Sequence, residues 1–152
     1  MDVGVVALAS DHAGFSLKEA MKPALDECGL THIDLGTDGL ESVDYPDFGF
    51  RMAQALADGR ASRGVLICGT GLGISMAANR FAWVRAAVCH DVTTARLGRE
   101  HNDANVLVLG GRLIGSEVAK DCLLTFLKTP FGGDRHLRRV GKLGTPPDLA
   151  GA

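Results

Sequence analysis

The chain has 152 residues, of which 46% are hydrophobic and 22% charged, and its formal net charge is −2. This length suits one compact domain and is too short for separate nucleotide and substrate domains. The small net charge gives no bulk attraction to nucleic acid or to a membrane surface. The apolar runs are too short to span a bilayer, and no basic segment precedes the first of them. We therefore expect a cytoplasmic protein without nucleic-acid or membrane partners.

Short β-branched runs flanked by Gly or Asp predict five buried strands. The strands are expected at residues 3–9, 33–35, 65–68, 84–89 and 106–109. Helical patterns separate them, which predicts a parallel sheet with right-handed crossovers. The expected fold is a single-domain, doubly wound, Rossmann-like α/β/α sandwich with a five-stranded parallel sheet.

The helical patterns have apolar residues at helical spacing. They are expected at residues 17–28, 48–58, 73–79, 92–100 and 116–128, with a short basic helix after Gly132. The pair Ser16 and Glu19 predicts a capping box at the first helix. Cys28 and Cys122 lie on apolar helix stripes, and the last eight residues, TPPDLAGA, are expected to be frayed.

The 4 cysteines and 5 histidines are scattered along the chain, without a CxxC pair or a close Cys/His cluster. Such spacing favours reduced thiols and indicates no metal site. We expect no cofactor, so the chemistry must come from side chains and the backbone.

The third predicted strand ends in Cys68, and a glycine-rich segment, Gly69-Thr70-Gly71-Leu72-Gly73, follows it. Glycines allow a ligand close to the backbone, and the start of a helix favours an anion. The spacing GxGxG differs from both the dinucleotide fingerprint and the P-loop. A thiol beside such donors suggests enolate chemistry, whereas the alternative is a tight turn with a buried cysteine.

Other reactive residues follow the remaining strands, and ligands of such sheets bind at the carboxyl ends of the strands. Asp11 and His12 follow the first strand, His90 and Asp91 the fourth, and Arg112 the fifth. These residues are expected to share one site with Cys68. Asp11 and His12 could instead only cap the first helix.

Three further segments each allow two interpretations. His101, in the segment 99–103, could be catalytic or could cap the end of its helix. The arginines at 135, 138 and 139 suit phosphate recognition, but they could equally form a solvated face. The segment DYPD at 44–47 could simply begin a helix.

Five motifs together resemble a known family. They are SDHAGFSLK (10–18), DYPD (44–47), ICGTGLGISMAANR (67–80), REHNDANVLVLGGR (99–112) and GGDRHLRRV (132–140). In this order they resemble the family of ribose-5-phosphate isomerase B and galactose-6-phosphate isomerase, over about residues 3 to 141.

The resemblance implies a catalytic group of three residues. Cys68 would move a proton between C1 and C2 of a sugar phosphate, Thr70 would assist, and His101 would help to open the sugar ring. Some family members replace the cysteine by a glutamate in the following helix, but that stretch reads SMAANR here, which favours the thiol. The implied substrate-binding residues are Asp11, His12, Tyr45, Gly69, Gly71, Leu72, Gly73, Asn102, Arg112, Arg135 and Arg139.

The implied activity is the interconversion of D-ribose 5-phosphate and D-ribulose 5-phosphate through an enediolate, without metal or cofactor. One alternative is the same chemistry on a tetrose, allose or galactose phosphate. Another is a phosphosugar-binding protein without catalysis. Galactose-6-phosphate isomerase divides its functional residues between two different subunits, whereas this chain carries the full set.

The resemblance also bears on domains and partners. Residues 1–152 are expected to form a single sugar-phosphate isomerase domain, in which 130–152 is a basic C-terminal extension that reaches a partner subunit. The expected assembly is a homodimer or homotetramer with shared active sites.

Overall fold

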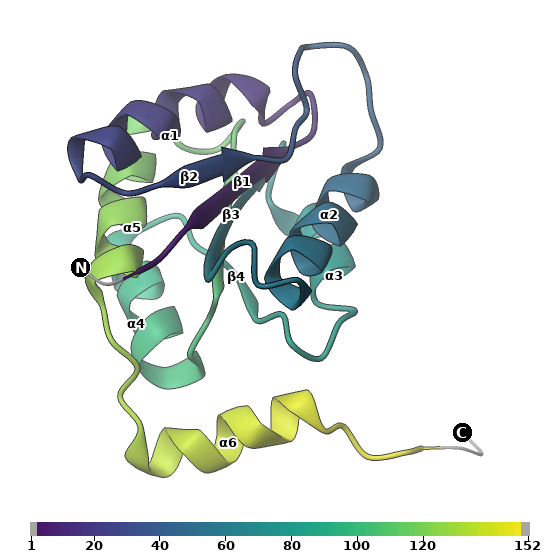
Figure 1. Cartoon of the computed structure of the whole chain (residues 1–152), viewed down its shortest axis with the longest axis vertical. Coiled ribbons are helices and arrows are strands. Elements are labelled where there is room, and N and C mark those ends of the chain that lie inside the picture. Colours follow the sequence, from purple (N-terminus) through teal and green to yellow (C-terminus); the bar gives the residue numbers. More distant parts are fainter. Residues whose placement is uncertain (1–2, 150–152) are drawn as a thin grey trace.

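The computed structural model describes residues 3–149, and in this range five parallel strands form one sheet in the order β2-β1-β3-β5-β4 (Figure 1). The strands are β1 (Val6–Ser10), β2 (His32–Asp34), β3 (Arg63–Cys68), β4 (Ala86–Val88) and β5 (Val106–Gly110). The predicted doubly wound α/β fold is confirmed.

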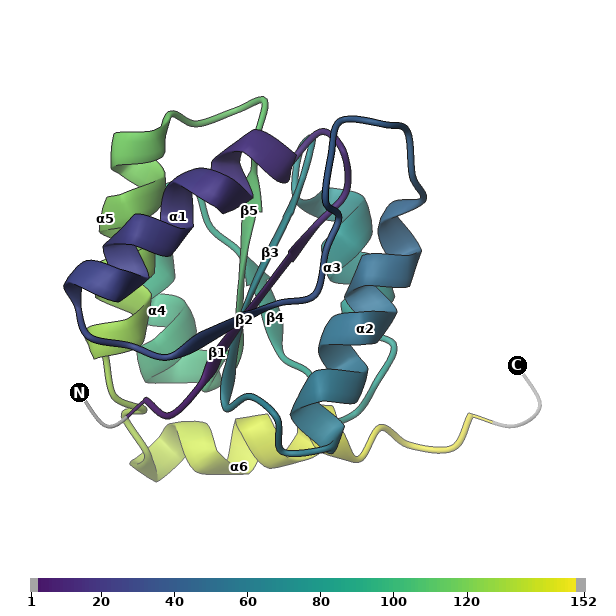
Figure 2. The ribbon, with the colours of Figure 1, turned by 45° about the horizontal axis from the view of Figure 1, so that its top comes forward.

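Helices cover both faces of the sheet, as Figure 2 shows with the sheet seen between its two helical layers. One layer consists of α1 (Phe15–Glu27), α4 (Val92–Asn102) and α5 (Ser116–Lys128), and the other of α2 (Tyr45–Ala57) and α3 (Leu72–Ala78). Side chains alternate between the faces of a strand. Thus Val6 and Leu8 of β1 join the core under α1 and α5, whereas Ala7 and Ala9 join the core under α2 and α3.

The first helix begins differently from the prediction. Its N-cap is Gly14, without a side-chain cap, so the predicted capping box of Ser16 and Glu19 is wrong. A Cβ atom on Gly14 would lie 2.4 Å from the carbonyl oxygen of Ile67, so close packing against β3 fixes this helix start. Glu19 binds Lys18 and Lys22 instead.

Several other boundaries shift by a few residues. The first strand begins at Val6 because Gly4 has a φ of +65°, which is not a strand conformation. The strand expected at 84–89 is shortened to Ala86–Val88, and Cys28 is the half-buried C-cap of α1 rather than a core residue. The last helix of the sandwich spans Ser116–Lys128 as predicted.

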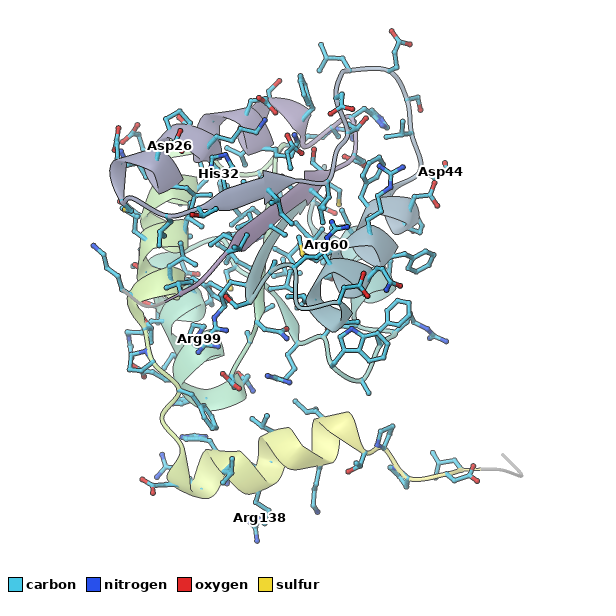
Figure 3. All side chains as sticks on the ribbon, viewed as in Figure 1. Asp26, His32, Asp44, Arg60, Arg99 and Arg138 are labelled. Atoms are coloured by element: carbon cyan, nitrogen blue, oxygen red, sulfur yellow. The ribbon has the colours of Figure 1, made fainter. Side chains whose placement is uncertain are left out.

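A separate helix, α6 (Asp134–Gly144), lies beyond the two layers, next to the end of α4 (Figures 1 and 2). None of its residues is buried, and Arg138 points away from the sheet (Figure 3). Residues 145–149 have no regular secondary structure, and the rest of the segment expected to be frayed, 150–152, lies outside the described residues. Within residues 3–149 no helix has the length and apolar character to cross a membrane.

Candidate active site

Cys68 lies at the carboxyl end of β3, where its side chain is 5% exposed. The backbone N–H of Gly71 donates a hydrogen bond to Cys68 Sγ, with an N to Sγ distance of 3.1 Å. Gly71 has a φ of 81°, a left-handed conformation that glycine adopts without strain. This turn therefore directs an N–H group at the sulfur, where it stabilises negative charge.

The end of β5 holds the glycine-rich loop in place. The N–H of Gly111 donates to the carbonyl oxygen of Cys68 at 2.8 Å, and the N–H of Arg112 donates to that of Gly69 at 3.0 Å. A Cβ on Gly69 would lie 3.3 Å from the Arg112 guanidinium, so this cation packs closely against the backbone of the loop. The carboxyl ends of the neighbouring strands β3 and β5 therefore contribute the Cys68 thiol and the Arg112 cation to one region.

Asp11 and His12 follow β1 and are both held by backbone donors. Asp11 is buried, and its Oδ1 accepts hydrogen bonds from the N–H groups of Ala13 at 2.9 Å and Gly14 at 3.1 Å. His12 Nδ1 accepts from the N–H of Val43 at 3.1 Å. Because Nδ1 is an acceptor here, Nε2 of a neutral His12 carries the hydrogen and can donate it to a ligand.

A cavity of about 270 Å³ joins these groups. The Tyr45 ring covers one side of this cavity and packs closely on Gly73, where a Cβ would lie 2.7 Å from the ring. Leu72 is 54% exposed and does not line the cavity, and its N–H donates to Thr70 Oγ1 at 3.3 Å. The lining residues are Asp11, His12, Ala13, Tyr45, Cys68, Gly69, Thr70, Gly73 and Arg112. The residues that follow β1, β3 and β5 thus lie around one cavity, whereas His90 and Asp91, which follow β4 and were expected at the same site, do not line it.

A second group of predicted site residues lies elsewhere in the chain. His101 and Asn102 end α4, and Arg135 and Arg139 belong to α6. Two adjoining cavities bring these residues together: one of about 350 Å³ holds His101 and Arg135, and one of about 310 Å³ holds His101, Asn102 and Arg139. Two arginines and imidazole groups line this space and suit an anionic ligand, although the carboxylates of Glu100 and Asp134 line the first cavity as well.

His136 is a member of this group that was not among the predicted site residues. Its ring stacks on that of His101, with centroids 4.4 Å apart and an interplanar angle of 13°. Desolvation lowers the pKa of His136, and the neighbouring His101 and Arg135 lower it further. In the sequence, His136 is indistinguishable from other members of a solvated basic run.

The two groups lie at opposite ends of the sheet. Cys68 pairs with Gly110 at the carboxyl end of β5, whereas His101 and Asn102 lie shortly before Val106, where β5 begins. These ends of β5 are about 13 Å apart at the usual rise of a strand. One chain therefore does not bring His101 to Cys68.

Two other titratable residues, Cys89 and Asp91, have contacts that indicate structural roles. Burial raises the pKa of Cys89 to about 11, so it remains a protonated thiol near neutral pH. Asp91 caps α4 by accepting from the N–H of Thr94 at 2.8 Å. No group of three or more His, Cys, Asp or Glu residues within residues 3–149 is arranged to hold a metal ion.

Comparison with known proteins identifies the class. Residues 6–143 match the family model described as Ribose/Galactose Isomerase. Ribose-5-phosphate isomerase B of Escherichia coli (strain K12) is 46% identical over 135 residues, which cover 89% of this chain and 91% of that protein. D-erythrulose-4-phosphate isomerase of Pectobacterium atrosepticum is 39% identical over 140 residues, which cover 91% and 92% of the two chains.

A crystal structure of a ribose 5-phosphate isomerase from Thermotoga maritima matches with a TM-score of 0.91 and 51% identity, covering 95% of this chain and 99% of that chain. The chain therefore belongs to the ribose/galactose isomerase family, and the resemblance of its motifs is confirmed. It is an isomerase of the aldose–ketose type.

Proposed function

We propose that this chain interconverts D-ribose 5-phosphate and D-ribulose 5-phosphate, with Cys68 as the base. The observation that carries this proposal is the N–H of Gly71 on Cys68 Sγ, in a cavity that also holds Asp11 and Arg112. The relatives from E. coli and T. maritima, which carry ribose 5-phosphate in their names, support the substrate.

The reaction needs one base that reaches two neighbouring carbons. The Cys68 thiolate removes the proton on C2 of the open aldose, and the C–H electron pair forms the C1–C2 double bond of an enediolate. The O1 oxygen takes up a proton. Loss of the O2 proton and return of the carbon-bound proton to C1 then give the ketose.

The loop and its neighbours act on the sugar oxygens. The backbone of Gly69 to Gly73 binds the enediolate oxygens, which lowers the barrier to their formation. Thr70 Oγ1 accepts from the N–H of Leu72, and its hydroxyl hydrogen donates to a substrate oxygen. Asp11 binds sugar hydroxyls, and His12 and Arg112 contribute to substrate and phosphate binding.

The site is shared between two copies of the chain. A second copy supplies His101 for ring opening, and Asn102, Arg135 and Arg139 for substrate binding. Two observations support this. The cations of α6 lie at the end of their own sheet that is opposite to Cys68. In addition, α6 exposes Leu137 (63%) and Leu143 (57%), which a partner could cover. The basic extension 130–152 is thus the part that reaches the partner subunit.

A second candidate is isomerisation of a tetrose phosphate, which the likeness to D-erythrulose-4-phosphate isomerase supports. The difference is one carbon, which small shifts around Tyr45 or α6 can accommodate. Assay of the purified chain alone on ribose, erythrose, allose and galactose phosphates separates the candidates. We expect the highest kcat/KM on ribose 5-phosphate. Binding of a phosphosugar without turnover of any would instead indicate a non-catalytic binding protein.

A further inference from the structure

His90 follows β4 and has no role in the reaction as described above. Its Nε2 atom is buried and has no hydrogen-bond partner among residues 3–149. A buried polar atom without a partner is unfavourable, so native proteins rarely keep one without a reason. The unpartnered Nε2 of His90 therefore indicates a role for this side chain.

The unpartnered nitrogen borders the glycine-rich loop. A Cβ placed on Gly110 would lie 3.0 Å from His90 Nε2 and 2.9 Å from the carbonyl oxygen of Thr70. Because Gly110 has no side chain, nothing from that residue separates the imidazole from the loop. Gly110 is also the residue of β5 that pairs with Cys68.

The Thr70 carbonyl belongs to the same peptide group as the Gly71 N–H, which donates to Cys68 Sγ. The Thr70–Gly71 peptide has its C=O on the Gly110 side and its N–H on Cys68 Sγ, at 3.1 Å. In a trans peptide these two groups point in opposite directions. A donor on the carbonyl polarises the peptide and makes its N–H a stronger donor to sulfur.

We propose that His90 is a positioning residue for Cys68. In this role the imidazole turns so that its Nε2–H donates to the carbonyl of Thr70, which holds the Gly71 N–H on Sγ and favours the thiolate. His90 acts through one peptide and does not touch the substrate. The inference rests on the proposed function only in taking Cys68 as the base.

The test compares His90→Phe, which removes the donor but keeps a ring, with His90→Gln, whose amide can replace the Nε2–H donor. His32→Phe is the control, because His32 lies in β2 at the other edge of the sheet. There its Nδ1 atom lies 3.4 Å from Oδ1 of Asp26, and both residues are labelled in Figure 3. Two quantities are measured: turnover of ribose 5-phosphate, and the rate at which iodoacetamide modifies Cys68 at neutral pH, followed by peptide mass spectrometry.

We expect His90→Phe to lower kcat by about five- to tenfold, the effect of one hydrogen bond, with KM changed by less than about twofold. Modification of Cys68 should slow by a similar factor, because iodoacetamide reacts with the thiolate. His90→Gln and His32→Phe should behave like the native protein. An unchanged modification rate in folded His90→Phe would overturn the proposal.

A second measurement needs no variant. Long-range proton–nitrogen NMR of the native protein should show neutral His90 with its hydrogen on Nε2, and a hydrogen on Nδ1 instead would refute the assigned role. If the chain does not isomerise ribose 5-phosphate, the proposed function fails. The difference in thiol modification between His90→Phe and His90→Gln still decides the role of His90.

Discussion

The imidazole rings of His101 and His136 stack with centroids 4.4 Å apart, which joins the end of α4 to α6. Cys68 lies at the other end of the sheet, beside Gly110. Each chain thus carries two groups of reactive residues that cannot meet within it. An active site shared between two chains, as proposed above, explains why these two groups lie apart in each chain.

The first prediction concerns the base. Cys68→Ala should lower kcat by about 1000-fold, because it removes the group that transfers the proton. Sugar-phosphate binding, measured by calorimetry, should persist because Arg112 and the residues of α6 remain. Cys28→Ala is the control: this half-buried C-cap lies outside the cavity and its removal should leave turnover unchanged. Native turnover in folded Cys68→Ala would exclude the thiol as the base.

Ring opening and proton transfer should be separable. In His101→Asn, turnover of cyclic ribose 5-phosphate should fall by about 100-fold, the usual contribution of a general acid or base. Ribulose 5-phosphate cannot close a furanose ring, so exchange of its C1 proton with deuterated solvent should stay near the native rate. Proton NMR measures this exchange. Equal losses in both measurements would place His101 in the proton-transfer step or make it structural.

The ion pair between the buried Lys18 and the partly exposed Asp34 should contribute to the acid sensitivity of the fold. Lys18 is fully buried and binds Asp34, and Lys22 binds the same carboxylate at 2.6 Å. Partial burial of Asp34 opposes its ionisation, but hydrogen bonds from Lys18 and Lys22 outweigh this and lower its pKa from the ordinary value of an aspartate. Asp34→Asn should therefore destabilise the protein by about 3 kcal/mol at neutral pH, since it leaves the Lys18 charge poorly paired.

The pH dependence of this effect has a defined sign. A carboxyl group whose pKa is lowered by folding stabilises the protein above its unfolded pKa, and the stabilisation disappears as the pH falls through the folded pKa. The difference between native protein and Asp34→Asn in urea unfolding should therefore shrink below about pH 4. The control Glu19→Gln, at a 41% exposed side chain, should cost only about 0.5 kcal/mol. A pH-independent difference would contradict this account.

Activity should not depend on a metal ion. The backbone of Gly69 to Gly73 is proposed to stabilise the enediolate oxygens, so exhaustive treatment with EDTA should leave kcat unchanged. Loss of activity that one divalent ion restores would show that the enediolate is stabilised by a metal instead.

The fold was largely predictable because short β-branched runs alternate with amphipathic segments. The helix Ser116–Lys128 was predicted with its observed bounds. The capping box failed because Ser-x-x-Glu is a local pattern, whereas the start of α1 depends on the approach of Gly14 to Ile67. A contact between distant segments leaves no local signal.

The site was predictable in part for the same reason. Asp11, Cys68 and Arg112 follow strands of one parallel sheet, so topology alone brings them together. His101 lies at a helix end, and no pattern within one chain tells which strand end it serves. The approach of both His90 Nε2 and the Thr70 carbonyl to Gly110 depends on the strand order β3-β5-β4, which the sequence does not specify.

Mixing of inactive subunits tests the shared site most directly. Equal amounts of Cys68→Ala and Arg139→Ala chains should regain about one quarter of native activity after subunit exchange, because half of the random dimers hold one intact site of two. Cys68→Ala mixed with Arg112→Ala is the matched control and should stay inactive, since both residues line the same cavity of one chain. Recovery in the first mixture alone is the predicted result. No recovery in the first mixture, with exchange demonstrated by mass spectrometry, would show that Cys68 and Arg139 serve a site within one chain.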